Sequence, residues 1–135
     1  MYKMKLFKDI TAEEIKQECI LVEDLLQASL NKASLLPVAR LVAIMTLEKT
    51  LRHILYAEYK TITKIKFSVL IDKGCQCGYM KTDIAEEFRK LKEYRNASAH
   101  HGLMLLDTIE TYMPVNEIIQ HIHDLLDNFA LTKEG

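Results

Sequence analysis

The sequence predicts an all-α fold, a bundle of four or five helices that run up and down within one domain. Apolar residues recur at steps of three and four, and helix start signals precede most of these stretches. The 135 residues are enough to enclose one core, and no repeat or low-complexity tract divides them. We expect a single domain over 1–135, with helices over about 12–31, 36–59, 62–72, 83–100 and 116–131.

The first helix has the clearest start. Thr11 and Glu14 have the spacing of a capping box, in which the threonine hydroxyl accepts from an N–H of the first turn and the glutamate reaches back. The apolar residues that follow share one helical face: Ile15, Cys19, Val22, Leu26 and Leu30. This pattern predicts an amphipathic helix.

The second helix is apolar around much of its circumference. Ser34 and Pro37 mark its start, because proline in the first turn loses no intrahelical hydrogen bond. Its apolar positions form two stripes: Val38, Leu41 and Met45 on one, and Ile44, Leu47, Leu51, Ile54 and Leu55 on the other. We therefore expect this helix to be central. Glu48 lies four residues before Arg52, which predicts an ion pair on the helix surface worth roughly a few tenths of a kcal/mol.

The middle of the chain predicts its secondary structure less clearly. Residues 61–71 fit a helix or a strand about equally well, and we interpret them as a short helix. Residues 73–79 include Gly74 and Gly78 and are expected to form a loop.

The last two helices again carry start signals. Asp83 is expected to cap one of them, which should run to about His100 before Gly102 stops it. Asn116 is expected to cap the other. The inward face of the final helix comprises Ile118, Ile119, Ile122, Leu125, Leu126 and Phe129.

Composition limits the partners, the cellular location and the metal sites that we expect. The net charge of −1 argues neither for nor against a polyanionic partner. No long apolar run or signal peptide is evident, so we expect a cytoplasmic protein without a membrane association. The pairs Cys75/Cys77 and His121/His123 have poor spacing for zinc, and we expect reduced thiols, no metal and no cofactor.

The sharpest chemical feature is the segment Arg95-Asn96-Ala97-Ser98-Ala99-His100. The spacing of its arginine and histidine is weak by itself, because chance often supplies it. The context strengthens it, since asparagine follows the arginine directly and the segment ends a helix that one further amphipathic helix follows.

This arrangement resembles the HEPN superfamily of helical-bundle nucleases and nucleotide-binding proteins, whose signature is an arginine, a polar residue and a histidine four to six residues beyond the arginine. Arg95, Asn96 and His100 match it, and the helix order over 11–131 agrees loosely. Gly102 stands where the toxin branch often has tyrosine. The resemblance implies metal-independent RNA cleavage by a homodimer with facing motifs, in a toxin–antitoxin or phage-defence setting, with a nucleotidyltransferase-type antitoxin as partner.

The resemblance also implies roles that residue chemistry permits. Arg95 presents a permanently charged planar fork that suits phosphate oxygens. His100 titrates near neutrality and could act as general base on a ribose 2′-hydroxyl or as general acid toward the leaving oxygen. Asn96 would orient the substrate. The expected RNA-binding residues are Ser98, His101 and Lys92.

Helix geometry limits this site. Residues five apart lie roughly 140° apart around an ideal helix, so one straight helix does not aim Arg95 and His100 at one phosphate. Either the helix loosens before Gly102 or two chains share the site.

Two other interpretations stay open. The chain could be a non-catalytic HEPN-like module that binds RNA, a nucleotide or a protein partner through the same groove. It could also be a structural adaptor in which Arg95 forms an ion pair near the helix end and His100 and His101 meet the terminal carbonyls.

Overall fold

The fold is known from a computed structural model, which describes residues 10–56, 65–101 and 112–134. These residues form α1 (Ala12–Ser29), the short 3-10 helix η2 (Ala33–Leu35), α2 (Leu36–Leu55), α3 (Phe67–Gln76), α4 (Thr82–His101) and α6 (Val115–Glu134), and they contain no strand. The prediction of an all-α bundle is confirmed for this part of the chain.

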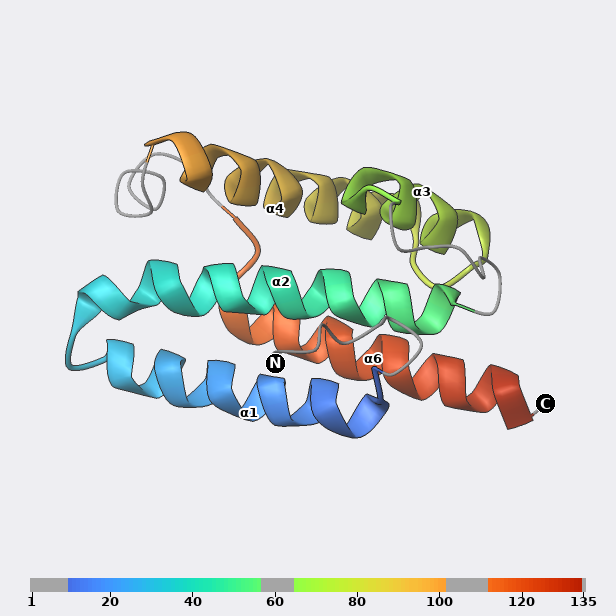
Figure 1. Ribbon diagram of the computed structural model, residues 1–135, viewed down its shortest axis with the longest axis horizontal. Helices are drawn as coiled ribbons and strands as arrows, with labels where there is room; N and C mark the ends of the chain where they lie inside the picture. Colours follow the sequence, from blue (N-terminus) through green and yellow to red (C-terminus); the bar gives the residue numbers. More distant parts are fainter. Residues whose placement is uncertain (1–9, 57–64, 102–111, 135) are drawn as a thin grey trace, which may run out of the picture.

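Helix α2 lies in the middle of the bundle (Figure 1). Helices α1 and α6 pack against α2 and against each other, while α3 and α4 pack against α2 from the other side. Helices α1 and α4 run opposite to α2, and α6 runs in the same direction as α2. The central position predicted for the second helix is confirmed.

Some of the predicted helix starts agree with the structure and others do not. Thr11 Oγ1 accepts from the Glu14 N–H at 3.2 Å, so the predicted cap of α1 is confirmed. Pro37 lies in the first turn of α2. Because α4 and α6 begin at Thr82 and Val115, Asp83 and Asn116 lie inside the first turns and the prediction that they are caps is wrong.

Several predicted ends differ by a few residues. Helix α1 ends at Ser29, two residues early, because the chain turns there toward η2. Helix α2 ends at Leu55, and residues 57–59 of its predicted span lie outside the described residues. The predicted stop at Gly102 lies outside them as well.

Helix α3 departs most from prediction. It is a helix as expected, but it covers Phe67–Gln76, so the first four residues of the predicted loop 73–79 are helical. Gly74 serves close packing here, since a Cβ on it would lie 2.7 Å from Met80 Cε and 3.6 Å from Leu51 Cδ2. The turn comes later, at Gly78, whose φ of +86° favours glycine. Residues 62–64 lie outside the described residues.

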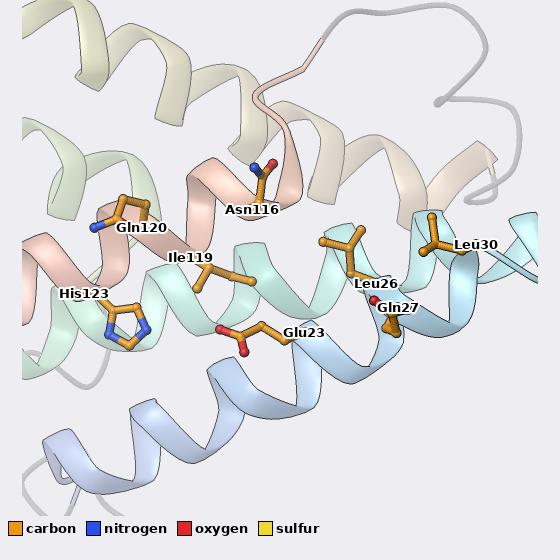
Figure 2. Close-up of a pocket in the computed structure, with 8 residues that line it drawn as sticks. All are labelled: Glu23, Leu26, Gln27, Leu30, Asn116, Ile119, Gln120 and His123. Atoms are coloured by element: carbon orange, nitrogen blue, oxygen red, sulfur yellow. The ribbon is translucent and has the colours of Figure 1, made fainter.

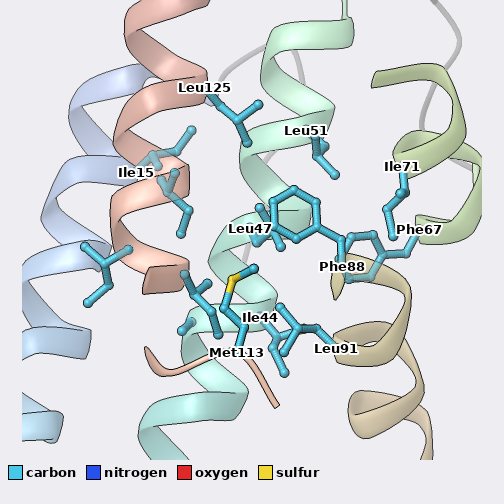
Figure 3. Close-up of a cluster of buried hydrophobic side chains, with 14 of the residues drawn as sticks. Ile15, Ile44, Leu47, Leu51, Phe67, Ile71, Phe88, Leu91, Met113 and Leu125 are labelled. Atoms are coloured by element: carbon cyan, nitrogen blue, oxygen red, sulfur yellow. The ribbon is translucent and has the colours of Figure 1, made fainter. Parts of the chain in front are cut away.

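The core joins the two sides of α2. Figure 3 shows Leu47 of α2 between Ile15 of α1 and Phe88 of α4, and all three side chains are fully buried. Other large buried side chains from α2, α3 and α4 are Ile44, Leu51, Ile54, Leu55, Phe67, Leu70, Ile71 and Tyr94.

Arg40 ties the start of α6 to α2 and α4. Its Nη1 donates to the Met113 carbonyl at 2.6 Å. Its guanidinium lies 5.9 Å from the centre of the Tyr94 ring and 5.8 Å from that of Tyr112, within the range of cation–π attraction. These contacts fix the direction in which the chain enters α6.

Core packing on α2 gives the first testable prediction. Leu47→Ala should lower the free energy of unfolding by about 2–4 kcal/mol, because it leaves a cavity at a fully buried position. Met45→Ala, two residues away and 55% exposed, should cost less than about 1 kcal/mol. Urea unfolding followed by circular dichroism measures both, and equal losses would contradict this packing.

The buried thiol of Cys19 predicts that the stability of the fold depends on pH. Burial, with Glu23 and Glu18 nearby, raises the pKa of its thiol to about 11. Below the ordinary pKa of 9.0 both states keep the proton, whereas between pH 9.0 and about 11 only the unfolded chain loses it. Stability should therefore fall over this window by up to about 3 kcal/mol.

The variant Cys19→Ala isolates that contribution from the other effects of alkaline pH on stability. It should be about 1 kcal/mol less stable than wild type at neutral pH, and the gap should close or reverse by pH 11. A constant gap in urea unfolding from pH 7 to 11 would contradict the assignment.

Candidate functional site

Arg95 lies on the side of α4 that faces α2 and α3. Its Nη1 donates to Glu48 Oε1 of α2. Its guanidinium also lies 5.2 Å from the centre of the buried Phe67 ring of α3, a cation–π geometry. The side chain keeps 31% of its surface exposed. The guanidinium is therefore fixed by two neighbouring helices and still reaches solvent.

The Glu48 carboxylate binds two arginines. Oε1 accepts from Arg95, and Oε2 accepts from Arg52 Nη2 at 2.8 Å. The predicted pair of Glu48 with Arg52 is confirmed, but its predicted place on the helix surface is wrong. The two side chains are only 17% and 10% exposed, because this ridge of α2 is covered from the side of α4.

Burial has an electrostatic consequence for both arginines. It lowers the pKa of Arg52 and of Arg95 below the ordinary value of a guanidinium. Both remain charged near neutral pH, because a guanidinium does not deprotonate in proteins. Two positive charges therefore share the Glu48 carboxylate.

A concavity of about 330 Å³ lies over this cluster, lined by Met45, Glu48, Lys49, Arg52 and Arg95. We call it the Arg95 hollow. Lys49, one of these lining residues, forms an ion pair with Glu18 of α1. Three cationic side chains and one carboxylate therefore line a space at the lower end of the size range of ligand pockets. Such a lining suits a phosphate group.

The other predicted contacts do not reach the hollow. Asn96 is exposed. Ser98 Oγ donates to the Arg95 carbonyl of its own helix at 2.7 Å, and Lys92 pairs with its neighbour Glu93 at 2.9 Å. Among the described side chains of the predicted motif, Arg95 meets the α2 cluster.

The direction of residue 100 follows from the backbone of α4. The helix runs unbroken from Thr82 through His101, so it does not loosen within the motif. Position 100 comes one turn after Asn96, on the ridge that also holds Glu93, and both of those residues are exposed. The side chains of His100 and His101 lie outside the described part of the structure. Within one chain, positions 95 and 100 therefore lie roughly 140° apart around the axis of α4.

The sequence interpretation missed Arg52, Lys49 and Met45 as lining residues. The usable signal was Glu48, an acidic residue within the apolar face of a central helix. A carboxylate in that place is expected to have a cationic partner. Arg52, four residues along the same helix, is one of the two partners that the structure shows, and Arg95 is the other. Arg95 reaches the same carboxylate only because α4 packs against α2, and the local sequence pattern does not indicate this packing.

The cysteines and histidines form no metal centre in the part of the chain that the structure describes, where no three His, Cys, Asp or Glu side chains come together. Cys75 and Cys77 are free thiols at the end of α3. The His121 ring packs edge-on against Phe88, with centroids 5.5 Å apart, and His53 packs against Phe129. In the described ranges no helix has both the length and the apolarity to cross a membrane.

The shared carboxylate gives a testable prediction. Glu48→Ala should cost about 1–3 kcal/mol of stability, because it removes the carboxylate that two partly buried guanidinium groups share. Combining it with Arg95→Ala should recover at least about 1 kcal/mol relative to additivity.

The matched control is Glu86→Ala, which breaks an ion pair with Arg89 that lies on the exposed side of α4. It should cost less than about 0.5 kcal/mol. Chemical denaturation of the wild type and the four variants measures these values, and equal costs for Glu48→Ala and Glu86→Ala would show that the Glu48 cluster adds no more stability than an exposed ion pair.

Comparisons of this chain with protein-family models, with curated proteins and with solved structures give no match. The chemistry of the Arg95 hollow is therefore inferred from the residues that line it.

Proposed function

We propose that this protein is a metal-independent RNA endonuclease of HEPN type that acts as a homodimer. The observation that carries the proposal is the placement of Arg95 in a solvent-open hollow beside Arg52, with Glu48 holding both. The match of Arg95, Asn96 and His100 to the HEPN signature supplies the reaction class.

The cationic lining supports phosphate binding. Guanidinium groups bind phosphate oxygens through paired N–H donors, and a fixed guanidinium stabilises the charge that develops at the phosphorus without having to reorganise. Glu48 is a positioning residue in this scheme, since it sets the orientation of both arginines. In the reaction, the ribose 2′-oxygen bonds to phosphorus while the bond from phosphorus to the 5′-oxygen breaks.

His100 transfers one of the two protons, and water exchanges the other. It acts either as the general base that takes the proton of the 2′-hydroxyl or as the general acid that gives a proton to the departing 5′-oxygen. Since positions 95 and 100 lie roughly 140° apart around one unbroken helix, we assign phosphate binding by Arg95 and proton transfer by His100 to opposite protomers. Each phosphate would then meet Arg95 of one chain and His100 of the other.

The function is tested with purified protein and total RNA in EDTA. Wild type should degrade the RNA, and Arg95→Ala and His100→Ala should each reduce the rate by about a hundredfold or more. Arg89→Ala is the matched control, because it removes an arginine of the same helix that pairs with Asp72 and Glu86 away from the hollow. If wild type binds RNA without cutting it, the chain is instead a non-catalytic HEPN-like binding module.

Mixing the two inactive variants tests the shared site. A heterodimer of Arg95→Ala with His100→Ala keeps one complete site, made from the arginine of one chain and the histidine of the other. An equal mixture that exchanges subunits freely should therefore recover about a quarter of the wild-type rate, because half of the dimers have one working site of two. Subunit exchange without any recovery would place both residues of a site in one chain.

A further inference from the structure

A second concavity lies between α1 and α6, with a volume of about 520 Å³. We call it the α1–α6 groove, and Figure 2 shows the side chains around it. Leu26 of α1 and Ile119 of α6 extend into the space between the two helices, and Glu23 and His123 extend toward each other across it. It shares no lining residue with the Arg95 hollow.

The groove combines an apolar base with polar walls. Ile119 is buried beneath it and Leu26 is half-buried, while Leu30 at one end is 75% exposed. When a partner covers an apolar side chain that is so open to water, the free energy of binding improves by roughly 25 cal/mol for each Å² of apolar surface that is buried. The walls include the carboxylate of Glu23 and the amide of Gln120, which accept hydrogen bonds.

Charge distinguishes this side of the molecule. Helix α1 carries five acidic residues and one basic residue, and α6 carries four acidic and one basic. Helix α2, in contrast, carries three basic residues and one acidic. The walls of the groove therefore lie in a region of negative potential, which attracts cations and repels RNA and anionic lipid.

We propose that the α1–α6 groove is a docking site for a basic amphipathic helix of a protein partner. Apolar side chains at helical spacing would cover Leu26, Leu30 and Ile119, and a lysine or arginine beside them would donate to Glu23. Charge complementarity selects this occupant, because an acidic or nucleic-acid ligand would be repelled by both helices. The inference is independent of the RNA chemistry proposed for the Arg95 hollow.

The probe is a synthetic helical peptide of leucine and lysine, about 14 residues or roughly four turns long, with a fluorescent label. Its binding to the full chain is measured by fluorescence anisotropy at about physiological salt. Glu23→Lys should weaken binding about tenfold or more. Asp24→Lys makes the same charge change one residue away on α1, outside the groove lining, and should weaken binding less than about threefold.

Leu30→Ser tests the apolar part without a charge change and should also weaken binding by about tenfold, because it removes an exposed contact. Circular dichroism confirms that the variants fold. The proposal is overturned if Glu23→Lys and Asp24→Lys have equal effects, if Leu30→Ser has none, if a leucine–glutamate peptide binds equally well, or if the leucine–lysine peptide does not bind.

Discussion

The carboxylate of Glu48 is the constraint around which the α2–α4 side of the bundle is arranged. A carboxylate within the apolar face of a central helix costs several kcal/mol to desolvate unless cations accompany it. Arg52 supplies one from the same helix, and Arg95 supplies the other from α4. Because Arg95 reaches this carboxylate from α4, the ion pair joins α4 to α2 at the hollow lined by Glu48, Arg52 and Arg95.

The helical repeat of apolar residues was sufficient to predict this arrangement in outline. The two apolar stripes of α2 predicted its central place, and the Thr11 cap predicted the start of α1, because both depend on local spacing. Gly74 misled the prediction, since glycine marks turns and also close approaches, and only the packing of Met80 and Leu51 separates the two.

The candidate site could be predicted only in part for the same reason. The sequence singles out Arg95, because a motif is a local pattern. The contact of Arg95 with Glu48 joins residues 47 positions apart in the chain, so only the packed structure shows it. Residues such as Arg52 and Lys49, which belong to no motif, enter the site through that packing.

The contact of Arg95 with Glu48 is compatible with phosphate binding. A guanidinium has five N–H donors in one plane, and the carboxylate engages it at Nη1. A phosphate that approaches from the open hollow can meet another edge of the same plane, so the ion pair need not break. In the proposed site Glu48 restrains the Arg95 side chain before a phosphate arrives, which lowers the entropy lost on binding.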